Sequence, residues 1–390
     1  MTDRSKRPDI NVGAAFRRPV VCGAAALAVA WLASVTVVVG QQPQLAGAAF
    51  KNVQILKDIP VDEFLGTMGF FSAATGLNCT DCHSEESGGN WAKYADESPL
   101  KIRARGMMRM MNTINAMNFG GRQVVTCFTC HRGVSRPSVM PSLDLLYSSP
   151  PPIEPGDPIT QAPNQPSVDQ ILETFVQAIG GAARVAALTS FTAQGTYTGF
   201  DDAEKSDLEV YAAAPGKHAI IARGKSGDTT TWTFDGTNAW LAAPAVAKPI
   251  PLIPTTGADL DGVKLESQLR FPTMIKQALT NWRVGYPTTI DDEDVAIVQG
   301  TTVNGAIATL CFDRKTGLLV RYVRYANSPV GRIVTRIDYS DYRDVPNAGV
   351  KIPFKWVVVG LTGRFTYQLT SVQPNVAIPA SRFAAPAPSR

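Results

Sequence analysis

The spacing of apolar residues predicts three amphipathic helices. Residues 61–76 place apolar side chains at helical intervals, and residues 98–119 begin with a capping serine and a proline and stop before two glycines. A third helix opens with a capping box formed by Ser167 and Gln170 and closes at Gly180.

A different pattern fills the second half of the chain, where short alternating, β-branched or aromatic runs recur between turn signals such as Asp235-Gly236 and Asn304-Gly305. This pattern predicts an antiparallel sheet with few helices. The predicted strands are residues 189–198, 208–213, 229–234, 306–312, 318–325, 332–339, 354–359 and 364–372.

An uncharged apolar stretch, residues 19–40, follows a basic leader that ends in Arg17-Arg18. Such a stretch is long enough to cross a bilayer as a helix, with its basic side in the cytoplasm. A cleaved signal peptide is the competing interpretation. Both interpretations place the rest of the chain on the periplasmic side of the cytoplasmic membrane.

These patterns divide the chain into four parts. Residues 1–49 hold the leader and the anchor or signal peptide, 50–147 form a mainly helical unit, and 148–166 form a linker. Residues 167–390 form an α+β domain dominated by a curved antiparallel sheet. The linker assignment rests on proline, which occupies seven of the seventeen positions from 150 to 166 and stiffens the chain into a spacer.

Composition narrows the function classes. The 390 residues are 45% hydrophobic and 18% charged, as in globular proteins, and the net charge is only +4. Five of the basic residues lie in the leader, so a nucleic-acid partner is not expected. Four of the six cysteines fall into two short motifs, which excludes a disulfide scaffold as the main stabilising device.

The two motifs are Cys-x-x-Cys-His, at residues 79–83 and 127–131. Two thiols one helical turn apart, followed by a histidine, are what covalent attachment of a c-type haem requires. We therefore expect two covalently bound haems c, held by Cys79, Cys82, Cys127 and Cys130, with His83 and His131 on the irons. A zinc site built from two Cys-x-x-Cys hooks and a thiol-redox motif are the weaker alternatives.

Methionine is the best candidate for the sixth iron ligand, because seven of the nine methionines lie in the helical unit. Met68 is the only one on the helix before the first motif. For the second motif, spacing leaves Met107, Met110 and Met111 open, since they share a helix face with Ile114. The one spare histidine, His218, is interpreted as a solvent-facing residue at a strand entry.

This set of motifs resembles the cytochrome c subunit of bacterial photosynthetic reaction centres, over less than a quarter of the chain. The matching residues are Phe50-Lys51-Asn52-Val53-Gln54, Met68-Gly69 ahead of Asn78-Cys79, Ala104-Arg105-x-Met107-x-x-Met110 with Ile114-Asn115, and Val125 through Gly133. The resemblance implies that Met68 and Met107 are the sixth ligands, with Met110 as the alternative to Met107. It also implies donation of electrons to an oxidised photosynthetic special pair. The family typically has four haems, one of them bis-histidine, whereas this chain has two motifs and no spare histidine in the unit.

The β domain is similar to lipoprotein-carrier-like half-barrels, through Phe234-Asp235-Gly236, Phe312-Asp313 with Thr316-Gly317, and Asp341-Tyr342-Arg343 before Gly349 to Pro353. Such a sheet curls round an apolar groove that would hold a lipid or a partner peptide. A packed scaffold that positions the helical unit is the alternative. Cys311 is interpreted as a small buried hydrophobic residue, and the domain has no Ser/His/Asp set or phosphate loop.

The sequence thus predicts a periplasm-facing dihaem c-type cytochrome that carries single electrons and is not an enzyme. Its partners would be a membrane-bound redox complex, such as a reaction centre, and a soluble or membrane-bound electron donor. An electron carrier to a non-photosynthetic membrane complex is one alternative. A haem enzyme such as a dihaem peroxidase, which needs an open sixth site, is the other.

Overall fold

The computed structural model describes residues 43–83, 90–148, 157–199, 205–244 and 248–388. Residues 41–390 form one compact unit. The expected apolar span at 19–40 lies outside the described residues, and within the described part none of the helices combines the length and apolarity needed to cross a membrane. The four-part division of the chain stays a prediction.

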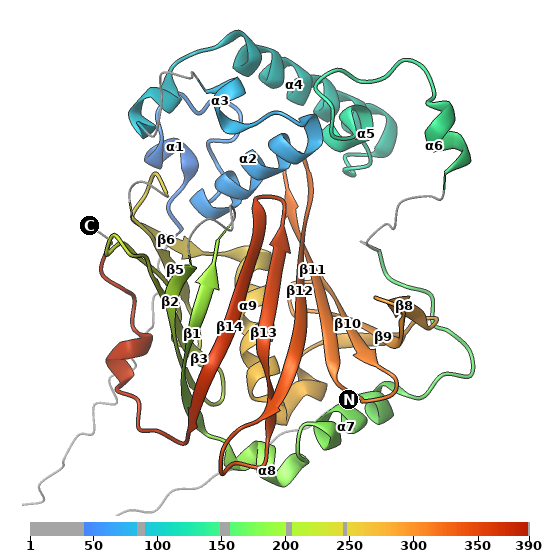
Figure 1. The fold of residues 1–390 in the computed structure, drawn as a ribbon. Coiled ribbons are helices and arrows are strands. Elements are labelled where there is room, and N and C mark those ends of the chain that lie inside the picture. Colours follow the sequence, from blue (N-terminus) through green and yellow to red (C-terminus); the bar gives the residue numbers. More distant parts are fainter. Residues whose placement is uncertain (1–42, 84–89, 149–156, 200–204, 245–247, 389–390) are drawn as a thin grey trace, which may run out of the picture. The chain divides into compact units, whose positions relative to one another are not determined.

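The N-terminal part is helical, as expected (Figure 1). The long helix α4 starts after the cap Ser98 with proline in its first turn, and it ends at Gly120 in the left-handed conformation. Helix α2 likewise ends at a left-handed glycine, Gly76. The helices of this part are α1 (Ala46–Ala49), α2 (Val61–Thr75), α3 (Cys79–Cys82), the 3₁₀ helix η2 (Trp91–Ala95), α4 (Pro99–Phe119), α5 (Cys127–His131) and α6 (Leu143–Tyr147).

The C-terminal part is an antiparallel sheet of fourteen strands within the described residues, in the order β6-β5-β4-β3-β2-β1-β14-β13-β12-β11-β10-β9-β7, with β8 paired to β9. All eight predicted strands are present. They are β1 (Ser190–Thr198), β2 (Lys205–Ala213), β4 (Thr229–Phe234), β10 (Ile307–Asp313), β11 (Leu319–Ser328), β12 (Gly331–Asp344), β13 (Lys351–Gly360) and β14 (Gly363–Pro374).

Six further strands were not predicted: β3 (Lys217–Arg223), β5 (Ala239–Ala242), β6 (Leu252–Thr255), β7 (Thr280–Val284), β8 (Thr288–Ile290) and β9 (Glu293–Thr301). β3 is buried on both faces over five successive residues, so it lacks the alternation that marks a strand with one wet face. Most of the others are too short to carry a periodic signal of their own.

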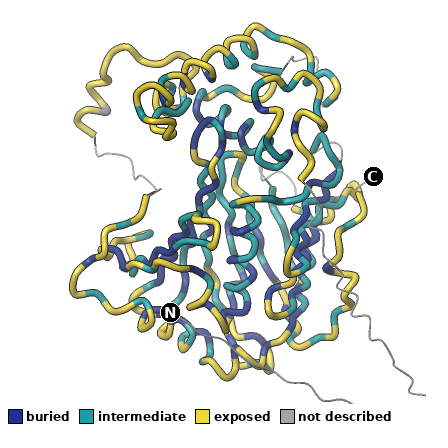
Figure 2. The backbone as a smooth tube through the Cα atoms, turned by 180° about the vertical axis from the view of Figure 1, so that it is seen from behind, coloured by how far each residue is buried: buried dark blue, intermediate teal, exposed yellow. Residues whose placement is uncertain are grey.

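Further helices pack against the sheet. They are α7 (Val168–Ala178), α8 (Ala182–Ala187), α9 (Gly257–Arg270) and the 3₁₀ helix η3 (Pro272–Gln277), and η4 (Ala380–Phe383) follows the last strand. The capping box of Ser167 and Gln170 opens α7 as expected. Leu172 and Phe175 of α7 and Leu265 of α9 join strand residues such as Phe312 in one apolar cluster. Figure 2 shows the resulting contrast between the buried strands and the largely exposed α4.

The turn between β11 and β12 reaches into the helical part. Val330 in this turn is fully buried in a second apolar cluster, with Leu56, Phe70 and Met108 of the helical part. Its carbonyl accepts a hydrogen bond from the N–H of Cys127 at 3.3 Å. The sheet therefore supports the second Cys-x-x-Cys-His motif directly.

Two polar contacts add to this connection. The Asp62 carboxylate on α2 accepts hydrogen bonds from the N–H and the hydroxyl of Thr256, just before α9, and Gln123 donates to the carbonyl of Ser328. The end of the proline-rich segment lies along the edge strand β7, where the N–H of Ala162 donates to the carbonyl of Val284.

Candidate haem-binding site

The first Cys-x-x-Cys-His motif forms the one-turn helix α3. Asn78 caps this helix by accepting the N–H groups of Thr80 and Asp81, while the Asp81 carboxylate accepts the N–H of Asn78. This capping box fixes Cys79 and Cys82 one helical turn apart. Neither cysteine is in a disulfide, and Ser98 at the start of α4 donates to the carbonyl of Cys82 at 2.8 Å.

His83 is held in a defined orientation at the end of α3. Its Nδ1 atom lies 2.9 Å from the carbonyl oxygen of Tyr94, and its ring stacks on the Tyr94 ring with centroids 4.4 Å apart. A carbonyl only accepts, so Nδ1 carries the proton and Nε2 keeps its lone pair. Burial, together with the nearby Lys101 cation, lowers the pKa of His83, which favours this neutral form.

The second motif repeats this arrangement in α5. Thr126 and Thr129 form the capping box, and Arg132 ends the helix in the left-handed conformation. The Nδ1 atom of His131 lies 3.0 Å from the carbonyl oxygen of Val134, so Nδ1 is the donor and Nε2 is not used in this contact.

The surroundings of α5 are fixed by its neighbours. Asn115 of α4 is buried, and its side-chain oxygen accepts the N–H groups of Val124 and Val125 while its amide donates to the Val125 carbonyl. After α5, the N–H of Gly133 donates to Ala74 at the end of α2. The backbone approaches so closely here that a Cβ on Gly76 would lie 2.3 Å from the Gly133 carbonyl oxygen.

The donor set at both motifs fits a c-type haem. Each offers two thiols on one helical turn and an imidazole whose Nδ1–H is already bound to a carbonyl, the usual support for a metal-ligating histidine.

A thiol-redox role is disfavoured, because such motifs depend on a lowered thiol pKa. Here burial raises the pKa of Cys82 and raises that of Cys127 to about 11. Among the described residues, no three His, Cys, Asp or Glu side chains gather as a metal site, so the two hooks are not joined as the zinc alternative needs.

The methionines at residues 107–111 of α4 fall into a buried pair and an exposed pair, and this grouping differs from the helix face predicted from spacing. Met108 and Met111 are 4% exposed and pack in the apolar cluster around Val330, whereas Met107 and Met110 are 44% and 50% exposed. Met68 is half-buried and packs against the same cluster. Because Met111 is buried in this cluster, we interpret it as a core residue. Met107 and Met110 remain the candidates on α4 for the sixth ligand of the second haem.

The interpretation of His218 as a solvent-facing residue is wrong. His218 lies in β3 and is 5% exposed, with its Nδ1 atom 3.0 Å from the Ser267 hydroxyl and 3.2 Å from the Arg270 guanidinium. Burial holds its pKa well below the usual histidine range. The error arose because β3, being buried on both faces, gives no sequence signal that separates inside from outside. Cys311 is buried, as expected.

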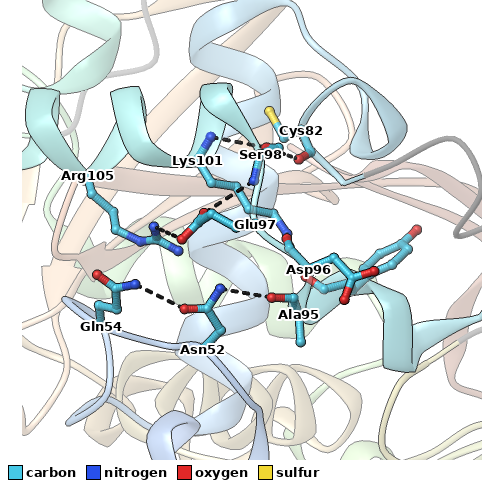
Figure 3. Close-up of polar contacts among 10 residues, drawn as sticks. Asn52, Gln54, Cys82, Ala95, Asp96, Glu97, Ser98, Lys101 and Arg105 are labelled. Atoms are coloured by element: carbon cyan, nitrogen blue, oxygen red, sulfur yellow. Dashed lines mark hydrogen bonds and ion pairs between the residues drawn. The ribbon is translucent and has the colours of Figure 1, made fainter.

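A polar network braces the first motif from the side of α4 (Figure 3). The Lys101 ammonium donates to the carbonyls of Tyr94 at 2.7 Å and Asp96 at 2.5 Å. Arg105 pairs with Glu97 at 2.8 Å, and Asn52 donates to the carbonyl of Ala95. Together these contacts hold the 91–97 segment, and with it Tyr94, against α4.

The β domain contains a cavity of about 70 Å³ between the sheet and helices α7 and α9, lined mainly by apolar residues with Glu266 and Arg270 in the wall. This volume is well below the roughly 300–1,000 Å³ of small-molecule pockets. This cavity is therefore too small to hold a lipid or a partner peptide, and a groove in the domain stays a prediction.

Comparison with known proteins agrees with this geometry. Residues 24–151 match the family model described as photosynthetic reaction centre cytochrome C subunit. The N-terminal part of this chain contains a domain of that family. Proteins of the family bind haem c and are typically electron carriers on the periplasmic side of the membrane.

Two curated relatives are photosynthetic reaction center cytochrome c subunits. The protein from Thermochromatium tepidum is 36% identical over 94 residues, which cover 23% of this chain and 22% of that protein. The protein from Roseobacter denitrificans is 33% identical over 103 residues, covering 24% and 27%. The chain thus spans about a quarter of the length of the relatives it matches.

Solved structures of DUF1329 and LolA superfamily proteins align with about half of this chain. A DUF1329 family protein from Desulfovibrio piger aligns with a TM-score of 0.39 and 13% identity, over 56% of this chain and 97% of that one. A LolA superfamily protein from Nitrosomonas europaea aligns with a TM-score of 0.38 and 13% identity, over 56% and 98%. This similarity concerns the fold alone.

Sequence reasoning made no prediction for Tyr94 and Lys101, which shape the first motif. It included Asn115 at the second motif but did not predict what this residue does. Asn115 was part of the family resemblance, so a signal for it existed. Tyr94 acts through its backbone carbonyl and its ring, and Lys101 acts through backbone carbonyls. Contacts of this kind leave no pattern in a sequence.

Proposed function

We propose that this chain is a dihaem c-type cytochrome that accepts and passes on single electrons at the periplasmic face of the cytoplasmic membrane. The observation that carries the proposal is the repeated geometry of the two motifs, in which a capped helical turn presents two thiols. In each motif a carbonyl also fixes the histidine with Nε2 available.

In this proposal the chain performs three tasks. Cys79 and Cys82, like Cys127 and Cys130, hold a haem by thioether bonds, and His83 and His131 bind iron through Nε2. Haem c, when bound, supplies a one-electron Fe(III)/Fe(II) couple. The carbonyls of Tyr94 and Val134 keep each imidazole in one orientation, which would present Nε2 to the iron.

We propose Met68 and Met107 as the sixth ligands, with Met110 as the alternative to Met107. The half-burial of Met68 on α2 and the exposure of Met107 and Met110 on α4 are compatible with these roles. A thioether opposite a histidine raises the potential of a haem and closes the iron to exogenous ligands, which suits electron transfer rather than peroxidase chemistry.

For the partner, we propose a membrane-bound photosynthetic reaction centre whose oxidised special pair this cytochrome re-reduces. The support is the family of the N-terminal domain and the reaction-centre subunits among its relatives. The direct test mixes the reduced protein with reaction-centre membranes lacking their own cytochrome and follows special-pair recovery after a flash. Recovery must accelerate with protein concentration, and an unchanged rate would redirect the proposal to another membrane complex.

The haem content of the purified full-length protein tests the electron-carrier proposal itself. A pyridine haemochrome assay should give two haems per chain, and a redox titration should give two one-electron steps. The double variant Cys79→Ser, Cys82→Ser should retain one haem and one step. Cys311→Ser is the matched control, because this buried cysteine lies in β10, outside both motifs, and it should retain two haems. A colourless wild-type protein would overturn the proposal.

A further inference from the structure

The carbonyl that orients His83 also binds a cation. The Tyr94 oxygen accepts the Nδ1–H of His83 at 2.9 Å and one hydrogen of the Lys101 ammonium at 2.7 Å. Lys101 lies on α4, is half-buried, and is held in place by a second carbonyl, that of Asp96, at 2.5 Å. A positive charge is therefore fixed two hydrogen bonds away from the imidazole.

The second motif lacks this feature. His131 donates to the carbonyl of Val134 at 3.0 Å, and in the described part of the chain no lysine or arginine donates to that oxygen. The nearest cations in sequence, Arg132 and Arg136, are exposed. The two sites thus differ in this half-buried cation, and also in their caps, where the Asp81 carboxylate of the first motif corresponds to the Thr129 hydroxyl of the second.

We infer that Lys101 is a positioning residue that raises the reduction potential of the first haem relative to the second. This inference rests on the proposed dihaem function. Two effects act in the same direction. A cation bound to the Tyr94 oxygen withdraws electron density, so the oxygen pulls less on the His83 proton and the imidazole donates less charge to iron. The charge itself also disfavours Fe(III) over Fe(II), and partial burial keeps solvent from screening it fully.

The consequence is a direction for electron flow. With Lys101 in place, the sharing of electrons between the two haems is shifted towards the first, so an electron entering at the second motif is drawn more strongly towards the first than it would be without this charge. The difference is built from side chains of this chain, independently of the donor or acceptor.

Redox titration of the full-length protein with Lys101→Gln tests the inference. Glutamine removes the charge but can still donate to a carbonyl. One of the two one-electron steps should move to lower potential, changing the equilibrium constant for electron sharing between the haems by three- to tenfold. At 59 mV per decade for one electron, this is about 30–60 mV. The other step should stay nearly fixed.

Two controls separate this effect from general ones. Lys101→Arg keeps the charge and should restore most of the potential, whereas Arg103→Gln removes an exposed charge from the same helix and should move neither step, because solvent screens it. Lys101→Met replaces the glutamine variant if that variant loses haem.

The outcomes are distinguishable. Two haems in every variant with unmoved potentials would overturn the role of Lys101 and leave the proposed function intact. Equal shifts of the reduction potential in Lys101→Gln and Arg103→Gln would also overturn the role of Lys101, because the effect would then depend only on the net charge of the protein. Fewer than two haems in the wild-type protein would overturn both.

Discussion

At the scale of single residues, both Cys-x-x-Cys-His motifs depend on the hydrogen bond that the Nδ1 atom of their histidine makes. Protonation of Nδ1 is set by a backbone carbonyl in each case, from Tyr94 or from Val134. In the proposed function, a methionine completes each iron, and its identity would depend on which methionine a helix turns towards the haem. Burial already assigns Met108 and Met111 to the apolar core.

Alanine variants test the remaining methionines. Met68→Ala should lower the potential of one haem and open its reduced form to carbon monoxide, because the thioether that closes the iron is gone. Met107→Ala should do the same to the other haem. Optical titration and carbon monoxide difference spectra measure both effects.

The control for these variants is Met117→Ala, since Met117 is 79% exposed near the end of α4 and should change neither spectrum. If Met110→Ala opens the second haem while Met107→Ala leaves it closed, the assignment passes to Met110.

At the scale of elements, the start of α2 is tied to the start of α9. The Asp62 carboxylate accepts the N–H of Thr256 at 2.5 Å and its hydroxyl at 2.9 Å. Asp62→Ala should lower the free energy of unfolding by about 1–3 kcal/mol, because the Thr256 donors lose their acceptor. Denaturant titration measures this change in the free energy of unfolding. The control is Asp58→Ala, which removes an exposed carboxylate from the same part of the chain and should lower the free energy of unfolding far less.

The net contribution of Asp62 to stability should also fall as the pH rises, because burial penalises its charged form. Burial raises the pKa of Asp62 above the usual aspartate range. In the window between the unfolded pKa and this raised value, the folded protein binds the extra proton, so the contribution of Asp62 to stability falls as the pH increases. The stability difference between the wild type and Asp62→Asn, measured from pH 4 upwards, isolates this trend. A difference that grows with pH would contradict it.

At the scale of the whole molecule, the β11–β12 turn makes the sheet part of the haem unit. Val330 is fully buried among residues of the helical part, and its carbonyl binds the N–H of Cys127. We therefore expect the haem unit and the sheet to unfold together rather than one after the other.

Val330→Ala should lower the stability of both parts equally, by about 1–3 kcal/mol for the lost methyl groups and the cavity they leave. Haem absorbance and tryptophan fluorescence, followed in one denaturant titration, should give coincident transitions that shift together. Val303→Ala, at an 86% exposed position in the β9–β10 turn, is the control and should shift neither. Separate transitions for the two signals would show that the parts are independent.

Local sequence determined much of this molecule. The caps at Ser98 and Ser167 and the left-handed glycine Gly120 predicted helix boundaries correctly, because capping depends only on neighbouring backbone groups. Predicted strands with one wet face, such as β2, were evident for the same reason, since such a strand records its orientation in its own residues. β10 is buried over five successive residues and was predicted from its apolar run and the turns beside it. The thiols and histidines of the two motifs were evident because haem attachment needs a fixed local spacing.

The tertiary structure decided what depends on distant partners. The burial of β3 hid both the strand and the true position of His218, whose partners lie about fifty residues away. Tyr94 and Lys101 act on His83 through a carbonyl, and Val330 supports Cys127 from another part of the chain. Contacts of this kind join residues at no fixed separation in the sequence, so no local pattern predicts them. They make two motifs differ that look equivalent in the sequence.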